Sequence, residues 1–389
     1  MMLGYLLARA GIDVLVLEKH ADFLRDFRGD TVHPSTLTVL DELGLLERFL
    51  MRPHQTLRQV KVQIGNHLFQ VGDFGRLRTK CPYIAFMPQW DFLDFLAEQA
   101  VSLPRFRLLM STEATKLMTR DNRVAGLRAQ GPEGELRIRA DLVIAADGRS
   151  SILRQQAGLK VLDVGAPIDV LWFRVGKGAD GAEQTLGRID AGRVLITIDR
   201  GDYWQCAYAI RKGAAEALKA GSLESFRQAV VAGAPYLNAG ISALASWEDV
   251  RVLSVAVDRL ERWSQPGLLC IGDAAHAMSP VGGVGINMAI QDAVAAANLL
   301  AGKLRSRTVT DRDLDAVRRR RLFPTRVTQA FQVFVQKRVL LPILSRKPFR
   351  VPLVVRALDG IKPLQWLPAR FVGIGVRPEH VQTPAWELS

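Results

Sequence analysis

One segment, residues 272–293, brings together at close spacing the residue types that a cofactor site needs. An acid, a proline and several glycines precede an apolar, Ala-rich helix expected at about 286–304; these residues are Asp273, Pro280, Gly282, Gly283 and Gly285. Glycine has no side chain, so such a turn lets the backbone approach a flat ligand closely. The N-terminus of the helix adds unpaired N–H groups and a partial positive charge. The segment therefore predicts a site for a group that becomes negative.

A second motif lies earlier in the chain, at residues 142–154. Its hydrophobic run predicts a buried strand that ends in Asp147, with Arg154 at a fixed offset behind it. Asp-Gly alone is a common turn and indicates little. A similar run, residues 267–271, leads into the glycine-rich segment and places Asp273 at the end of a buried strand, where ligands meet parallel sheets.

Together, the two motifs resemble those of the para-hydroxybenzoate-hydroxylase-type flavoprotein monooxygenases, single-component aromatic hydroxylases that use FAD and NAD(P)H. The resemblance extends from Met1 to about Leu304 and is loose beyond that point. It implies an FAD-dependent oxidoreductase that hydroxylates an aromatic or other activated apolar substrate through a flavin C4a-hydroperoxide. Dioxygen would be the co-substrate, and NADH or NADPH the transient reductant. The oxygen chemistry is the cofactor's, so no protein nucleophile is needed and no catalytic side chain or metal is assigned.

The resemblance also implies roles for the residues of the glycine-rich segment. Asp273 would bond the ribityl chain of FAD, although its type and place also fit a turn or helix-capping acid. Three residues would lie along the isoalloxazine ring: Pro280, Gly282 and Gly283. The next three would place backbone N–H groups near the N1–C2=O edge, where a helix N-terminus stabilises the charge of reduced flavin: Gly285, Ile286 and Asn287. His276 lies beside this segment and is expected to be structural.

Three further residues are assigned by the same resemblance. Arg28 would reach the FAD from the loop after the second strand, since an arginine fork suits a pyrophosphate. Gln89, at the start of a helix, would contact the ribityl or phosphate region. Asp147 would serve both FAD and the nicotinamide cofactor, and the alternative is that it caps a turn and pairs with Arg154.

The start of the chain departs from the family pattern, because the strand and the Gly-x-Gly-x-x-Gly turn that seat the pyrophosphate are absent. Residues 1–11 read as the helix that normally follows that turn, and residues 12–18 as the second strand. Glu18 then falls where the dinucleotide fold places the carboxylate that bonds the adenosine ribose. We therefore expect a truncated or mis-assigned start, and FAD binding that is weak or absent.

Two alternatives remain open at this point: an FAD-dependent reductase of an isoprenoid-like substrate on the same scaffold, and a flavin-free remnant without activity. A halogenase is not expected, since its Trp-x-Trp-x-Ile-Pro run is absent. The choice between NADH and NADPH also stays open, because the family docks the nicotinamide without a second glycine motif.

The elements that must position these residues indicate an α/β fold. We expect a discontinuous Rossmann-like FAD-binding domain at residues 1–160 and 261–310, without its first strand and glycine turn. An antiparallel-sheet substrate domain is inserted at 161–260, where apolar and polar residues alternate between Gly/Asp turns. Residues 311–389 form a helical C-terminal region that prolines, Pro324 among them, are expected to break.

The substrate is expected on the inserted sheet. Aromatic residues on or beside its strands could line an apolar pocket, although sheet aromatics more often form core: Trp172, Phe173, Tyr203, Trp204 and Tyr208. Alternate ones must point to the same face. The proline-broken tail is expected to cover this pocket or to form a homodimer contact.

The formal net charge of +13 is concentrated late in the chain. Nucleic acid is not expected as a partner, because no nucleic-acid motif or aromatic stacking platform accompanies the basic residues. The basic residues indicate a solvated helix face, and the alternative is weak contact with a membrane surface where apolar residues such as Phe331 and Ile343 lie beside the charges. Three distant cysteines form no zinc spacing and fit a reducing cytoplasm. No uninterrupted apolar stretch is expected to span a membrane.

Overall fold

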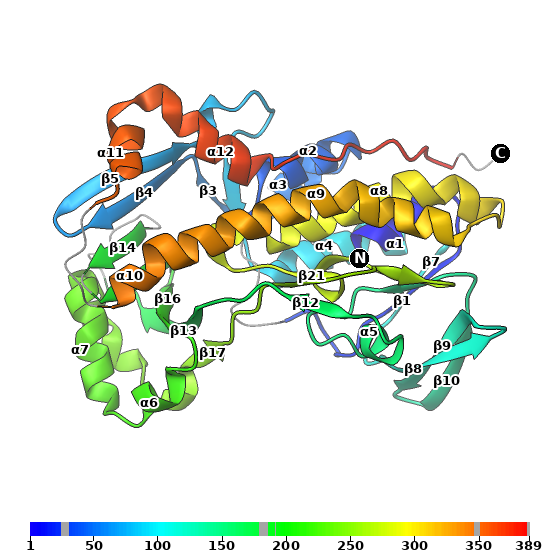
Figure 1. Ribbon diagram of the computed structural model, residues 1–389, viewed down its shortest axis with the longest axis horizontal. Coiled ribbons are helices and arrows are strands. Elements are labelled where there is room, and N and C mark those ends of the chain that lie inside the picture. The colour runs from blue at the N-terminus through cyan, green and yellow to red at the C-terminus, as the bar shows by residue number, and fades with distance from the viewer. Residues whose placement is uncertain (25–30, 179–185, 191, 346–350, 387–389) are drawn as a thin grey trace.

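The structure is a computed structural model that describes residues 1–24, 31–178, 186–190, 192–345 and 351–386. Two long helices, α8 (Gly285–Arg305) and α9 (Asp311–Val335), pack against each other and run along the length of the molecule (Figure 1). In the described residues, short parallel strand pairs, three small antiparallel sheets and one seven-stranded sheet surround them.

The parallel part is built from short strands and the helices that cover them. Two pairs run parallel: β1 (Val14–Leu17) with β7 (Phe106–Leu109), and β11 (Val143–Ala145) with β20 (Leu268–Cys270). The covering helices are α1 (Met2–Arg9) and α4 (Gln89–Val101), and α1 also contacts α8. Their apolar faces form the main core of the protein with α8. This arrangement confirms the α/β class and the strand–turn–helix order predicted around the glycine-rich segment.

Smaller elements complete this part. They are β2 (Thr31–Val32), α2 (Pro34–Glu42), α3 (Leu46–Leu50), β3 (Gln55–Leu57), β6 (Ile84–Phe86), α5 (Ile152–Gln156), β12 (Val161–Asp163), β18 (Asp258–Leu260), β19 (Ser264–Gln265) and β21 (His276–Ala277). An antiparallel sheet of β8 (Glu113–Arg120), β9 (Arg123–Gly131) and β10 (Gly134–Arg139) lies at one end of the molecule (Figure 1). β10 and β11 are separate strands although they are close in sequence, because β10 pairs with β9 whereas β11 pairs with β20.

The seven-stranded sheet has the order β17-β13-β16-β15-β14-β4-β5. Its strands are β17 (Arg251–Leu253), β13 (Ile168–Gly176), β16 (Tyr203–Arg211), β15 (Arg193–Asp199), β14 (Leu186–Asp190), β4 (Gln59–Ile64) and β5 (His67–Asp73). Neighbours are antiparallel except β14 and β4, which run parallel with Arg188 opposite Gln63. Two strands of this sheet, β4 and β5, therefore come from the predicted FAD-binding range. A substrate domain that begins at residue 161 does not include them. The division into domains otherwise stays a prediction.

The two faces of this sheet are covered by different segments. On one face lie α6 (Ala215–Lys219) and α7 (Leu223–Gly233), packed on an apolar cluster that includes Phe173 and Trp204. On the other face lie α10 (Leu341–Leu344) and α12 (Trp366–Gly373), and α11 (Leu353–Gly360) contacts β5 (Figure 1). The helical C-terminal region is confirmed, and it closes the face that the inserted strands leave open.

Helix α9 runs through Pro324, so the expectation that this proline breaks the helix is wrong. Proline removes one N–H donor from the helix. The loss is tolerated here because Pro324 is buried and side chains on both sides of it bond other segments. Arg321 does so before the proline, and Gln329 and Gln332 do so after it. Tertiary hydrogen bonds, rather than local propensity, keep α9 continuous.

Helix α8 is the central core helix. By length and composition, the stretch Val281–Arg305 is one candidate for a membrane span among the described residues, and 72% of its apolar window is buried inside the protein. The stretch contains Asn287, Gln291 and Asp292, so it is not an uninterrupted apolar run. The burial accounts for the apolar composition, because a helix surrounded by protein is hydrophobic on all sides.

Candidate cofactor site

Two acids lie at the carboxyl edge of the parallel strands. In the register of β11 and β20, Ala145 is opposite Cys270, and the Ile271 N–H donates to the Ala145 carbonyl at 3.0 Å. Asp147 and Asp273 each follow their strand within three residues. Asp273 is half-buried in the 3₁₀ turn Gly272–Ala274, and Asp147 is exposed. The structure therefore brings these two predicted site residues to one edge.

The turn that carries Asp273 is fixed to α8 by a buried carboxylate. The Gly272 N–H donates to Asp292 Oδ2 at 3.0 Å, and a Cβ on Gly272 would lie 3.1 Å from the Cβ of Ala289. His276 Nε2 donates to the same Asp292 oxygen at 2.6 Å, and Arg321 Nε donates to the other oxygen at 2.9 Å. Burial alone would raise the pKa of Asp292, but His276 and Arg321 hold it below its usual value. His276 is buried in this network, which fits the structural role expected for it.

The loop before α8 has the shape that its glycines predict. Gly282 and Gly283 have φ values of 81° and 61°, which favour glycine. A Cβ on Gly283 would lie 2.5 Å from Thr31 Oγ1, and this hydroxyl donates to the Gly283 carbonyl at 2.8 Å. In contrast, a Cβ on Gly285 would meet no atom within 4 Å. Gly283 is thus required by the fold, whereas Gly285 borders open space.

The N-terminus of α8 is available to a ligand. Its N-cap, Val284, provides no side-chain cap, and the first-turn N–H groups of a helix have no partners within the helix. An open Gly285 beside an uncapped N-terminus fits a flat ligand with negative charge at one edge. FAD has that chemistry, so the residues present fit the cofactor that the sequence implied.

The side chain of Asn287 has a structural role in addition to the role predicted for its N–H. Its Oδ1 accepts from the His33 N–H at 2.9 Å and from Thr36 Oγ1 at 2.8 Å. Its Nδ2 donates to the carbonyls of Thr31 at 3.1 Å and Gly283 at 3.3 Å. The amide therefore joins the start of α8 to β2 and α2, and the backbone N–H groups remain for a ligand.

His33 was not selected from the sequence, but it lies at the centre of this junction. Its ring is fully buried, and its Nδ1 is 2.9 Å from the Val372 carbonyl. Its Nε2 has no hydrogen-bond partner within the described part of the chain. Burial lowers the pKa of His33 to about 4, so the ring is neutral at pH 7. Only its position directly before Pro34 at a helix start hinted at a special role.

Three glutamines of α9 and the turn after it form a second set that sequence reasoning missed. Gln332 Nε2 donates to the carbonyls of Ser279 at 2.8 Å and Val281 at 2.9 Å, and its Oε1 accepts from the Ser279 N–H at 3.1 Å. Gln329 Nε2 donates to the Ala277 carbonyl at 3.1 Å, and Gln336 bonds Ser279 Oγ. Their spacing of three and four positions places all three on one helix face, which is the signal that could have identified them.

In the second motif, residues 142–154, Asp147 and Arg154 follow the turn-and-ion-pair interpretation only in part. Asp147 Oδ2 accepts from the Leu153 N–H at 3.3 Å in the first turn of α5, whose N-cap residue is Ser151. Arg154 is buried and lies 3.8 Å from Asp258, and its Nη1 donates to the Ala274 carbonyl at 3.3 Å. No Asp147–Arg154 ion pair is present in the described residues. Arg154 therefore bonds the same 3₁₀ turn that Asp292 bonds, at its other end.

The remaining predicted residues lie further from this junction. Glu18 directly follows β1; its N–H donates to the Leu109 carbonyl at 2.9 Å, and its Oε1 accepts from the His20 N–H at 2.9 Å. Gln89 is half-buried as the first residue of α4. Arg28 lies outside the described residues.

The aromatic residues of the large sheet divide between its two faces. Phe173, Trp204 and Tyr208 are buried under α7 in the core, which favours the core interpretation for them. Tyr203 lies under the guanidinium of Arg174, at 4.9 Å. Trp172 points to the other face, where it is half-buried against the cluster that includes Ile198 and Val372.

Comparisons with known proteins agree with this geometry. The FAD binding domain family matches residues 1–331. The 6-methylpretetramide 4-monooxygenase of Streptomyces rimosus is 32% identical over 345 residues, which are 87% of this chain and 81% of that protein. The para-nitrophenol 4-monooxygenase of Pseudomonas sp. (strain WBC-3) is 24% identical over 82% of this chain and 79% of its own length.

The fold is also similar to that of solved structures. The crystal structure of p-nitrophenol 4-monooxygenase from Pseudomonas putida DLL-E4 superposes with a TM-score of 0.75 at 21% identity, covering 97% of this chain and 95% of that one. The family match spans both motifs, α8 and most of α9. The chain therefore belongs to the FAD-binding family of para-hydroxybenzoate-hydroxylase-type aromatic monooxygenases and is an FAD-dependent oxidoreductase.

Proposed function

We propose that this protein is an NAD(P)H-using monooxygenase that hydroxylates an aromatic or other activated apolar molecule. The observation that carries the proposal is the uncapped start of α8 beside an open Gly285, linked through Val372 to an apolar face of the large sheet. Relatives named as monooxygenases of 6-methylpretetramide and para-nitrophenol support a ring-bearing substrate. Activation of dioxygen at reduced flavin, as the resemblance implied, is part of the same proposal.

The residues that would hold FAD form two groups. Along and beside the isoalloxazine ring we place Pro280, Gly282, Gly283, Gly285, Ile286 and Asn287, with Asp273 on the ribityl chain. Further along the cofactor we place Glu18, Gln89 and Asp147, and Arg28 stays a prediction outside the described residues. Bound FAD supplies hydride acceptance and the reaction with dioxygen. The protein binds and orients the ring, and the α8 N-terminus stabilises negative charge on it.

Exclusion of water falls to an apolar cover at the same place. Met278, Val284 and Met288 form a small buried cluster against which Val372 of α12 packs. Val372 and Trp172 also pack against the cluster on the face of the large sheet that α12 covers. We therefore place the substrate on this face, between Trp172 and the glycine loop (residues 280–285). The reason is that Val372 packs against both the sheet cluster and the cluster beside the loop.

Location and partners remain proposals. We place the enzyme in the cytoplasm, since three free, buried cysteines suit a reducing compartment. Membrane contact through the residues named from the sequence has limited support, because Ile343 is fully buried against Val194 and Ala209. Phe331 and Phe334 of α9 are exposed, and a second copy of the chain is one partner for them.

Oxygen consumption would test the function. The purified chain is incubated with FAD, desalted, and assayed with NADH or NADPH against a panel of phenols and larger polyphenols. A monooxygenase consumes one dioxygen per NAD(P)H oxidised and incorporates label from ¹⁸O₂ into the product. Reduction of a substrate double bond without oxygen uptake would favour the reductase alternative. A protein that retains no flavin under these conditions would contradict the proposal.

A further inference from the structure

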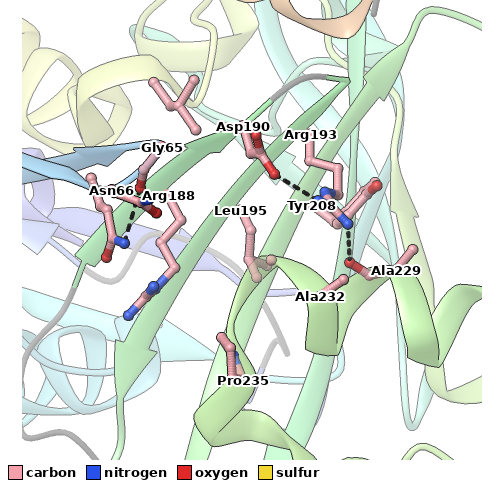
Figure 2. A pocket seen from close by; sticks show the side chains of 13 residues that line it. Gly65, Asn66, Arg188, Asp190, Arg193, Leu195, Tyr208, Ala229, Ala232 and Pro235 are labelled. Atoms are coloured by element: carbon pink, nitrogen blue, oxygen red, sulfur yellow. Dashed lines mark hydrogen bonds and ion pairs between the residues drawn. The ribbon is translucent and has the colours of Figure 1, made fainter.

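A pocket unrelated to the glycine loop lies on the α7 face of the seven-stranded sheet (Figure 2). The strand register aligns four side chains across neighbouring strands. Gln63 is opposite Arg188, Arg188 is opposite Leu195, and Leu195 is opposite Tyr208. Residues directly opposite one another in a sheet share a face, so these four side chains form one row along the floor of the pocket.

Small residues of α7 leave room above this row. Ala229, Ala232 and Gly233 line the pocket from the helix, and Pro235 follows at its end (Figure 2). The cavity has a volume of about 230 Å³. This lies below the usual size of a pocket for a drug-sized ligand, so the space suits a small molecule. Leu195, Ala229 and Ala232 give part of the lining an apolar surface, which suits an apolar body.

The charge in the pocket comes from two arginines on opposite sides of Leu195 (Figure 2). Arg193 donates to Asp190 Oδ2 at 2.6 Å and to the Ala229 carbonyl at 3.4 Å, and its Nε–H remains buried without a partner. Arg188 lies over the ring of Tyr236 at 5.0 Å, and its Nε–H is also buried without a partner. Arg188 forms no ion pair with an acid in the parts of the chain that the structure describes.

We propose that this pocket binds a small organic acid, with its carboxylate facing Arg188 and its apolar body against Leu195 and α7. A guanidinium fork matches the two oxygens of a carboxylate, and a buried N–H gains by finding an acceptor. Arg188 is the favoured partner because Arg193 is already neutralised by Asp190. The site lies on the sheet face opposite Trp172, so it is separate from the site proposed for the hydroxylated substrate.

Calorimetric titration of the whole chain, loaded with FAD, tests this site. The probes are benzoate, a carboxylate with an apolar body, and inorganic phosphate, an oxyanion without one, at constant ionic strength. We expect saturable binding of benzoate that weakens at least tenfold in Arg188→Met, which keeps the stem and removes the charge. Ala229→Leu fills the cavity without changing charge, and it should weaken benzoate binding to a similar degree.

Arg137→Met is the matched control, because it removes an exposed arginine from a different sheet, and it should bind benzoate as the parent does. Equal benzoate binding in all variants would place the ligand elsewhere and overturn the proposal. So would binding of phosphate without benzoate, or the absence of saturable heat with either probe. If Arg188→Met does not fold, as judged by circular dichroism, Ala229→Leu decides the question alone.

Discussion

The glycine loop and the large sheet present their surfaces to a ligand by opposite means. At the loop, the backbone itself is exposed, and buried polar side chains such as Asp292, Asn287 and Gln332 hold it in place. On the sheet, side chains form the surface, and apolar packing around Phe226 and Trp204 holds it. A loop that binds with its backbone tolerates little displacement, whereas a sheet face can change its side chains. Damage to the loop's polar supports should therefore affect both folding and FAD, and damage to the sheet core should affect folding alone.

The largest effect is expected from Asp292→Ala. The change removes the carboxylate that His276 and Arg321 share and leaves Arg321 with Glu379, at 3.5 Å, as its remaining acid. Breaking a buried pair in this way costs about 3–5 kcal/mol of unfolding free energy. The Gly272 N–H also loses its acceptor, so FAD retention after desalting should fall. Urea unfolding and flavin absorbance measure the two effects. Asp141→Ala, at an exposed carboxylate, is the control, and a similar loss in both variants would refute the argument.

A pH effect of similar size is expected from His33. Its pKa is about 4 in the folded protein and about 6.5 in an unfolded chain, so the unfolded state binds the extra proton between these values. The contribution of neutral His33 to the free energy of unfolding is therefore fully present above about pH 6.5. It falls as the pH drops towards 4, by about 3 kcal/mol over the whole range. Urea midpoints at pH 7 and pH 5 measure the slope. In His33→Asn the difference between the two pH values should shrink; an unchanged slope would assign it to other groups.

Gln332→Leu should have a moderate effect that reaches the cofactor. The change leaves the N–H and carbonyl of Ser279 without partners, which costs about 1–3 kcal/mol. We expect the Kd for FAD to rise about tenfold, because the loop that would lie along the ring loses its support. Gln365→Leu is the matched control: Gln365 is equally buried, but it bonds Gln70 near α11. Weaker FAD binding in that control would remove the distinction between the two regions.

The glycine pair at the start of α8 separates folding from ligand approach. Gly285→Ala should leave stability within about 1 kcal/mol of the parent, since a Cβ there meets no atom and alanine suits a helix. FAD binding should nevertheless weaken, because the methyl group projects into the space that the ring needs. Gly283→Ala should instead destabilise the protein through its clash with Thr31. Calorimetric melting and FAD titration of both variants check this; tight FAD binding by Gly285→Ala would move the ring elsewhere.

The smallest effect is expected on the sheet side. Phe226→Leu replaces a ring that packs edge-on against Phe173 and Tyr208, and it should cost about 1 kcal/mol. The Kd for FAD should stay as in the parent, because α7 lies on the sheet face away from α12. An FAD affinity that falls with this change would show that the two regions are coupled.

Much of the fold was predictable from local pattern. The buried strands expected before Asp147 and Asp273 and the helix start at Gln89 agree with β11, β20 and α4, because hydrophobic runs and periodicity are properties of one segment. The glycine loop was predictable for the same reason: glycine content and a following apolar helix specify a strand–turn–helix unit. The residues that lie at the carboxyl edge, Asp147 and Asp273, followed from those strands.

What the sequence by itself determined is therefore the order and type of the elements and the position of the backbone site. Only the tertiary structure decided that β4 joins β14 in parallel, that α9 continues through Pro324, and that Gln332 clamps a loop 53 positions away. His33 and the Arg188 pocket belong to the same class, because each depends on segments that meet only in the fold. A hydrogen bond within one helix or turn leaves a repeating pattern in the sequence. A bond between distant segments leaves none, since either partner alone looks like an ordinary polar residue.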